Sequence, residues 1–138
     1  MQDKVEYWLD LADEDLKVAD SMLKAKHYLY VGFMCHLTIE KALKAVVAHV
    51  TEGLPPKIHN LPVLAEKALL EDKMGEEQFD FIRELNPLNI EGRYPSYKEQ
   101  VSQILSKEYC EKLIKRTEEM LCWIKQQLSV MPKDTQTK

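Results

Sequence analysis

The longest apolar segment of the chain runs from Val31 to Val50 and has the periodicity of an α-helix. At the helical period, one face carries only small or apolar residues: Gly32, Cys35, Ile39, Ala42, Leu43, Val46 and Val50. The far face is also apolar, with Tyr30, Met34, Leu37 and Ala48. Because a helix that is apolar on two sides is buried on two sides, we expect this helix to pack against its own core and against a second surface.

Three polar side chains interrupt this apolar helix at a spacing of four residues: His36, Glu40 and Lys44. Residues at this spacing lie on successive turns of one helix face. An unpaired polar group in a buried helix costs about 1–3 kcal/mol, so these side chains need partners. We interpret them as a buried polar network or as a network at a dimer interface.

The rest of the pattern predicts four further helices and no β-strand. Their expected positions are about Asp3 to Lys24, a segment that follows the N-cap Asn60, a short segment that ends at Asn86-Pro87, and about Lys107 to Met131. The stretch from Leu88 to Leu105 is predicted to be irregular. A loop of this length inside a compact helical domain is more often functional than a simple connection.

Long helices with short connections predict an all-α protein, an up-and-down bundle of four to five helices with long antiparallel members. We expect residues 1–131 to form a single helical domain and residues 132–138 a disordered C-terminal tail. In such a bundle the turn at Pro55 to His59 and the loop around Arg93 lie at the same end. We therefore expect a functional site at that end of the bundle.

Composition and charge exclude several classes of protein. The net charge is −4, which argues against a protein that coats nucleic acid by bulk electrostatics. No apolar run reaches the ~20 residues that span a membrane, and the first residues lack the pattern of a signal peptide. The three cysteines form no CxxC motif and are interpreted as reduced thiols. We expect a cytoplasmic protein that does not associate with a membrane.

The four histidines argue against a metal site, because they show none of the paired ligand spacings of zinc proteins. The four glycines form no nucleotide-binding loop motif, and the chain has no recognisable Ser/His/Asp arrangement. We therefore expect no metal and no cofactor, and the sequence assigns no catalytic residue.

His59 is the first candidate for chemistry, because it lies beside Lys57 and directly before a helix start at Asn60. Free backbone N–H groups at a helix start attract phosphate, so His59 is interpreted as an anion contact or an acid/base group. The alternative is a histidine that only forms a hydrogen bond to its own loop.

Arg93, Tyr94 and Tyr97 place a guanidinium group and two aromatic rings in one predicted loop. Arginine binds phosphate through its planar fork, and aromatic rings stack on bases. The alternative is that Tyr94 packs into the bundle end while Arg93 pairs with a carboxylate. The expected nucleotide-binding residues are Arg93, Tyr94, Tyr97, His59 and Lys57. Trp8 and Trp123 are expected to be packing residues, with Trp8 away from this site.

Three segments, taken in this order, resemble the HEPN family of small helical-bundle domains. The first is the segment 33–45, with Glu-Lys-Ala-Leu-Lys at its centre. The second is Pro-Lys-Ile-His-Asn-Leu at 56–61, which is similar to the family's His-x-Leu start of the next helix. The third is Arg-Tyr-Pro at 93–95. The opening helix fits as well, so the resemblance covers nearly the whole chain.

The resemblance implies a homodimeric helical bundle that binds a nucleotide, RNA or a partner protein. It also implies an accessory role beside a small nucleotidyltransferase, in some cases as a toxin–antitoxin component. Many relatives cut RNA without a metal, and these share an arginine with a histidine a few residues later. This chain departs from that pattern, because no histidine follows Arg83, Arg93 or Arg116.

We therefore expect a homodimeric nucleotide-binding or partner-binding accessory of a nucleotidyltransferase. The homodimer is expected to use the central helix, where Met34 and Leu37 remain once the main core face is assigned. One alternative is a metal-independent ribonuclease with an altered site, in which His59 and Arg93 meet across loops and His59 acts as general base or acid. Another alternative is a purely structural helical interaction module.

Overall fold

The computed structural model describes residues 3–132, which fold into six α-helices and two 3₁₀ helices and contain no β-strand. The elements are α1 (Asp3–Lys24), α2 (Tyr28–Thr51), α3 (Leu61–Lys67), η1 (Glu71–Lys73), α4 (Glu76–Leu85), η2 (Asn86–Leu88), α5 (Pro95–Ile104) and α6 (Lys107–Val130). The prediction of an all-α helical bundle is confirmed. All but the first residue of the predicted tail 132–138 lie outside the described residues.

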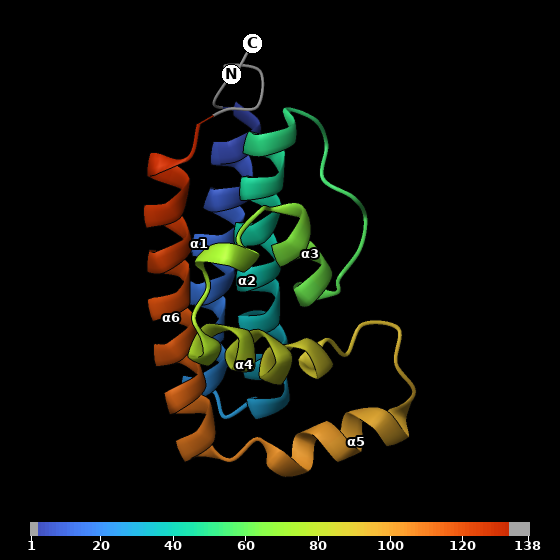
Figure 1. Ribbon diagram of the computed structural model, residues 1–138. Helices are drawn as coiled ribbons and strands as arrows, with labels where there is room; N and C mark the ends of the chain where they lie inside the picture. The colour runs from blue at the N-terminus through green and yellow to red at the C-terminus, as the bar shows by residue number, and fades with distance from the viewer. Residues whose placement is uncertain (1–2, 133–138) are drawn as a thin grey trace.

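Three long helices form the frame of the protein. In Figure 1, α1, α2 and α6 lie side by side, with α1 antiparallel to the other two. The short helices α3 and α4 pack on the outside of this frame, and α5 extends away from it at the end where α6 begins. None of the helices within residues 3–132 has both the length and the apolar character that crossing a membrane requires.

The central helix α2 is buried on two sides, as its sequence pattern predicts. Every residue of the main apolar face, from Gly32 to Val50, is buried in the large core that α2 shares with the other helices. On the far side, Ala45 and Ala48 pack with Val5 in a second cluster against α1. The second surface is thus largely α1 of the same chain, and only Tyr30 and its neighbours leave this side partly open, with Tyr30 46% exposed.

Local sequence explains where the helices around the site begin and end. The residue that ends α2 is Glu52, whose left-handed backbone with φ of 54° reverses the chain. The buried Pro55 and its neighbour Pro56 follow and prevent the helix from resuming. Asn60 caps α3 as predicted, because its side-chain oxygen accepts a hydrogen bond from the N–H of Val63 at 3.0 Å.

The prediction that Leu88 to Leu105 is irregular is wrong for residues 95–104, which form α5. Pro95 occupies the first turn of this helix, where its missing N–H costs nothing. Val101 and Leu105 are buried and hold α5 to the bundle. The helix approaches α2 closely at Gly32, where an added Cβ would lie 3.1 Å from a methyl group of Leu105. So few apolar anchors leave too weak a periodic pattern to predict the helix.

Candidate functional site

The segment between α2 and α3 brings His59 back to the middle of α2. In Figure 1 this segment runs back alongside α2 before α3 begins. His59 Nδ1 consequently lies 2.9 Å from Glu40 Oε2, although Glu40 is far from the end of its helix. The prediction that the turn ending at His59 lies at the bundle end is therefore wrong for His59, which contacts the middle of α2 on the side of the bundle.

Glu40 is the centre of a polar cluster, and only 2% of its surface is exposed. Its Oε2 atom lies 2.9 Å from Lys44 Nζ and 2.9 Å from His59 Nδ1. Its Oε1 atom lies 3.5 Å from Nδ1 of the fully buried His36. The structure therefore places His36, Glu40 and Lys44 in one buried group and adds His59 to it from another part of the chain.

His36 holds the backbone of the returning segment. Its Nε2 atom lies 3.1 Å from the carbonyl oxygen of His59, which can only accept a hydrogen bond, so Nε2 carries the hydrogen. Burial lowers the pKa of His36 to about 4, and this outweighs the opposite effect of the Glu40 carboxylate. The ring is therefore neutral at pH 7, and its Nδ1 and Glu40 Oε1 have no hydrogen-bond partner among the described residues.

The ring of His59 is oriented by Glu40. A carboxylate accepts hydrogen bonds, so Nδ1 of His59 carries the hydrogen that points to Glu40 Oε2. The neutral ring then presents the lone pair of Nε2 on the side away from Glu40, and 53% of the side chain is exposed. A histidine whose Nδ1–H is held by a carboxylate is a well-placed proton acceptor for a group in front of it.

His59 and Arg93 line one hollow of about 310 Å³, which we call the His59 hollow. Three asparagines share its wall, and each side-chain oxygen accepts a hydrogen bond from a backbone N–H: Asn60 from Val63, Asn86 from Leu61, and Asn89 from Glu91. The three amide nitrogens take no part in any hydrogen bond within residues 3–132. The His59 hollow is therefore rich in uncommitted N–H donors.

The start of α3 is not an anion site, which corrects the expectation for this helix. The N–H of Leu61 donates to Asn86, the N–H of Val63 donates to Asn60, and Pro62 has no N–H. The N–H of Leu64 is used within the helix. The donors of the hollow are thus side-chain amides, and the sequence pattern does not reveal the part that Asn86 and Asn89 take in it. For Asn86 the pattern indicates only a helix stop.

A tight turn places Arg93 at the hollow. The N–H of Arg93 donates to the carbonyl oxygen of Ile90 at 3.2 Å, and Gly92 has a φ of +73°, which favours glycine. The guanidinium carbon of Arg93 lies 4.6 Å from the ring centroid of Tyr97. Tyr97 itself is held because its hydroxyl donates to the carbonyl oxygen of Pro87 at 2.5 Å. Among the described residues, Arg93 is therefore paired with an aromatic ring and not with a carboxylate.

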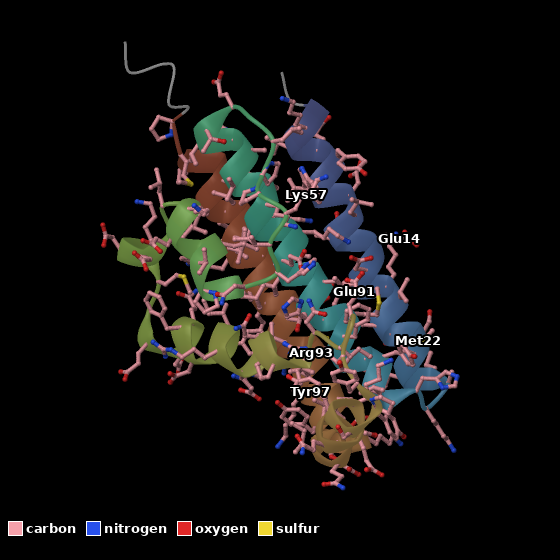
Figure 2. All side chains as sticks on the ribbon, turned by 90° about the vertical axis from the view of Figure 1, so that its right-hand side faces the viewer. Glu14, Met22, Lys57, Glu91, Arg93 and Tyr97 are labelled. Carbon is pink, nitrogen blue, oxygen red and sulfur yellow. The ribbon has the colours of Figure 1, made fainter. Side chains whose placement is uncertain are left out.

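Two of the predicted nucleotide-binding residues lie outside this arrangement. Tyr94 is 82% exposed and does not line the His59 hollow, so it does not pack into the bundle end either. Lys57 is exposed, and in Figure 2 it lies well away from Arg93 and Tyr97 along the bundle. The structure thus brings together His59 and Arg93, with Tyr97 beside them, but not Lys57 or Tyr94.

A second and larger hollow of about 540 Å³ adjoins the first along α2, and we call it the Trp8 hollow. Figure 2 faces this side of the molecule, with Glu14 and Met22 on one flank and Glu91 and Arg93 on the other. The lining includes Trp8 of α1 and Phe33 and Leu37 of α2. The expectation that Trp8 lies away from the site is wrong, since His59 lines the same hollow.

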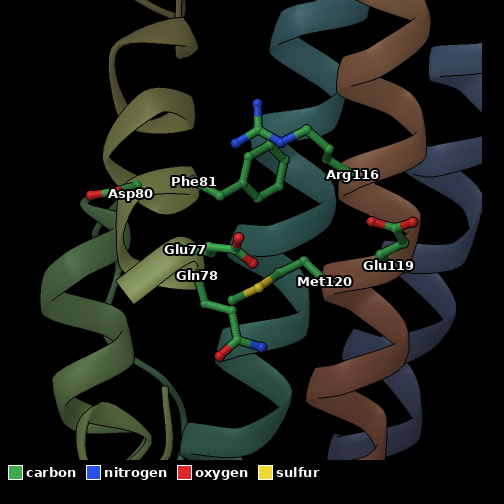
Figure 3. Close-up of a pocket in the computed structure, with 7 residues that line it drawn as sticks. All are labelled: Glu77, Gln78, Asp80, Phe81, Arg116, Glu119 and Met120. Carbon is green, nitrogen blue, oxygen red and sulfur yellow. The ribbon is translucent and has the colours of Figure 1, made fainter. Parts of the chain in front are cut away.

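A third hollow of about 380 Å³ lies between α4 and α6 and is shown in Figure 3. Arg116 lies over the ring of Phe81 and forms an ion pair with Glu84 at 3.0 Å. The other charged residues of the lining are acidic: Glu77, Asp80 and Glu119. This hollow contains none of the predicted site residues and is unsuited to an anion. Within the described part of the chain, no group of His, Cys, Asp or Glu residues is placed to hold a metal ion.

Comparisons with known proteins agree with this architecture. The family model for the HEPN domain matches residues 5–127. The crystal structure of TT1696 from Thermus thermophilus superposes with a TM-score of 0.73 at 19% sequence identity, covering 89% of this chain and 97% of that one. At this identity the likeness establishes the fold alone. A search of curated proteins finds no match.

The neutral state of His36 makes the stability of the fold depend on pH. The unfolded chain, with an ordinary histidine pKa of 6.5, takes up a proton as the pH falls below that value, whereas the folded chain does so only near pH 4. The contribution of the neutral ring is therefore fully present above pH 6.5 and is lost as the pH falls towards 4. Over this range we expect wild-type protein to lose about 3 kcal/mol more unfolding free energy than His36→Gln.

Urea denaturation at a series of pH values measures this difference. The glutamine amide can still donate to the carbonyl oxygen of His59, so the substitution removes the titration and keeps the hydrogen bond. Parallel pH profiles for the two proteins would contradict the assignment of a neutral, buried His36.

Proposed function

The chain belongs to the HEPN domain family, and from this premise we propose that it binds a nucleotide whose phosphate occupies the His59 hollow. One observation carries the proposal. Side chains from the segment before α3 and from the segment between α4 and α5 converge on one hollow, where His59, the three asparagines and Arg93 can donate hydrogen bonds and Glu91 is the one carboxylate among the described residues that line it.

A phosphate group needs positive charge and several N–H donors within reach. Arg93 supplies a guanidinium fork whose position is supported by Tyr97. The amides of Asn60, Asn86 and Asn89 supply neutral donors, and His59 contributes a group that donates when protonated and accepts when neutral. The net charge of −4 does not oppose this, because charges farther than about 8–10 Å from the ligand are largely screened.

A metal-independent ribonuclease is the second candidate, and the pairing of Glu40 with His59 supports it. In such a reaction His59 Nε2 would take the proton of a 2′-hydroxyl, the 2′-oxygen would bond to phosphorus, and the bond from phosphorus to the 5′-oxygen would break. Arg93 would balance the charge that builds up on the phosphate. The leaving 5′-oxygen also needs a proton, and the chain lacks the histidine that follows the arginine in the family's nucleases. Binding is therefore better supported than cleavage.

Membership of the HEPN family also supports a proposal about the partner protein. We propose that this nucleotide-binding domain is an accessory of a small nucleotidyltransferase, in the manner of a toxin–antitoxin pair. A single domain over residues 1–131 and a cytoplasmic location remain predictions from the sequence.

A homodimer through α2 is part of the same proposal. Tyr30, Met34 and Leu37 are the residues of the far face that are not fully buried, and of these Met34 packs against the main core. A stable dimer buries at least ~1,000 Å² in total, so a charge inside that area is disruptive. We expect light scattering to give twice the chain mass of 16.1 kDa for the wild type, and a shift towards monomer for Leu37→Glu. The control is Leu54→Glu, at a residue that is 80% exposed in a loop. A wild-type monomer at micromolar concentration would contradict the dimer.

The phosphate contact of Arg93 is tested by calorimetry with adenine and guanine nucleotides. We expect Arg93→Ala to weaken binding by about 1.5–3 kcal/mol, the usual contribution of a hydrogen bond to a charged group. The matched control is Arg83→Ala, because Arg83 also lies over an aromatic ring, Phe79, but on α4 and outside the hollow. The control should bind as the wild type does.

Two experimental outcomes would favour another function over nucleotide binding. If no nucleotide binds to folded protein, the interaction module becomes the better account. If the purified protein cleaves RNA robustly in the presence of a chelator, and His59→Gln abolishes the cleavage, the ribonuclease is the function and its general acid has to be sought.

A further inference from the structure

We propose that the Trp8 hollow is the subsite for the aromatic base of the nucleotide, with Trp8 as its stacking surface. This inference rests on the proposed function, because it takes the phosphate to lie in the His59 hollow. It assigns a binding role to Trp8, which the sequence predicts to be a packing residue and which packs against the second apolar cluster.

The two hollows are adjacent, because His59, Glu91 and Gly92 line both of them. Gly92 has no side chain to close the junction, and beyond its chain neighbours no atom lies within 4 Å of the position that a Cβ would take there. A ligand anchored by its phosphate in the His59 hollow would extend past Gly92 towards Trp8, where no side chain of residue 92 stands in its way.

The lining of the Trp8 hollow matches a base better than an aliphatic group. Trp8 provides an aromatic face beside Lys44, and Phe33, Leu37 and Ile90 provide apolar surface elsewhere in the same hollow. Charged side chains also line this hollow: Lys44, which pairs with Glu40, together with Lys98 and Glu91. An aliphatic ligand would leave these charged groups facing apolar atoms, whereas a base offers them a π-face together with ring acceptors and donors.

The indole ring of Trp8 is held in position before any ligand arrives. Lys44 Nζ lies 5.6 Å from the ring centroid, and the ring of Tyr7 contacts it edge-on with centroids 5.4 Å apart. Lys44 is in turn fixed by its ion pair with Glu40. A platform that is already fixed loses little conformational entropy when a base stacks on it.

The Trp8 hollow is long enough to hold a base at one end and the proposed dimer contact at the other. Along α2 its lining extends from Tyr30 to Lys44, a distance of about 21 Å at the rise of an α-helix. A dimer contact at Tyr30 and Leu37 leaves the other end, where Trp8, Lys44 and His59 lie, to the base.

Tryptophan fluorescence tests the proposal directly, because the chain has only two tryptophans. Trp123 lies on α6 and packs against the main core, so Trp123→Phe gives a protein in which Trp8 alone reports. We expect a nucleotide to quench this emission in a saturable way, and ribose 5-phosphate and inorganic phosphate to bind without quenching it. In Trp8→Phe, where Trp123 alone reports, nucleotides should leave the emission unchanged.

Calorimetry on Trp8→Ala measures how much Trp8 contributes to the affinity for nucleotides. We expect roughly tenfold weaker binding of nucleotides, in line with the effect of alanine substitution at stacking residues, and unchanged binding of ribose 5-phosphate. If Trp8→Ala does not fold, the fluorescence of Trp123→Phe decides alone, because it keeps Trp8 in place.

The results separate the failure of this inference from the failure of the proposed function. If nucleotides and ribose 5-phosphate bind equally well, both depend on Arg93, and Trp8 emission does not respond, the base subsite is wrong and the phosphate site stands. If neither nucleotides nor phosphates bind, the proposed function fails and the subsite with it.

Discussion

A carboxylate inside an apolar helix needs charged or hydrogen-bonding partners, because its desolvation costs several kcal/mol. Glu40 meets this need with Lys44, one turn further along α2, and with His59, which comes from a different part of the chain. The pair with Lys44 is buried, and removal of one partner from such a pair typically costs about 3–5 kcal/mol. The requirement to partner Glu40 therefore ties the segment between α2 and α3 to the side of the bundle.

The geometry of the candidate site follows from this attachment. Glu40 fixes the ring of His59, and His36 fixes its backbone carbonyl. With His59 in place, Asn60 begins α3 and Asn86 reaches across to the first N–H of that helix. The amide nitrogens that remain, together with Arg93, give the hollow its donors. The proposed phosphate site is thus built largely from asparagines whose side-chain oxygens already accept hydrogen bonds within the fold.

Much of this arrangement could be predicted from sequence, because it is local. The periodicity of residues 31–50 predicts the buried helix and the line of polar residues within it, His36, Glu40 and Lys44. The position of Asn60 before Pro62 predicts the cap of α3. The resemblance in the three quoted segments predicts the family.

The parts that could not be predicted depend on contacts between distant residues. The pairing of Glu40 with His59 places the site at mid-helix, whereas a count of helices places it at the bundle end. The bond from Leu61 to Asn86 removes the free N–H on which the expected phosphate contact relied. Trp8 reaches the site because α1 packs along α2, and no pattern within α1 indicates that neighbour. These features become visible only when the chain is folded.

The central claim is that Glu40 holds His59 with its Nε2 atom directed away from the carboxylate. Long-range proton–nitrogen NMR on uniformly labelled wild-type protein at pH 8 tests this directly, because it distinguishes the two neutral forms of each histidine ring. The account predicts that His59 carries its hydrogen on Nδ1, the form that is less populated in free histidine, and that His36 carries it on Nε2. A His59 ring protonated on Nε2, or one that exchanges between both forms, would contradict the account.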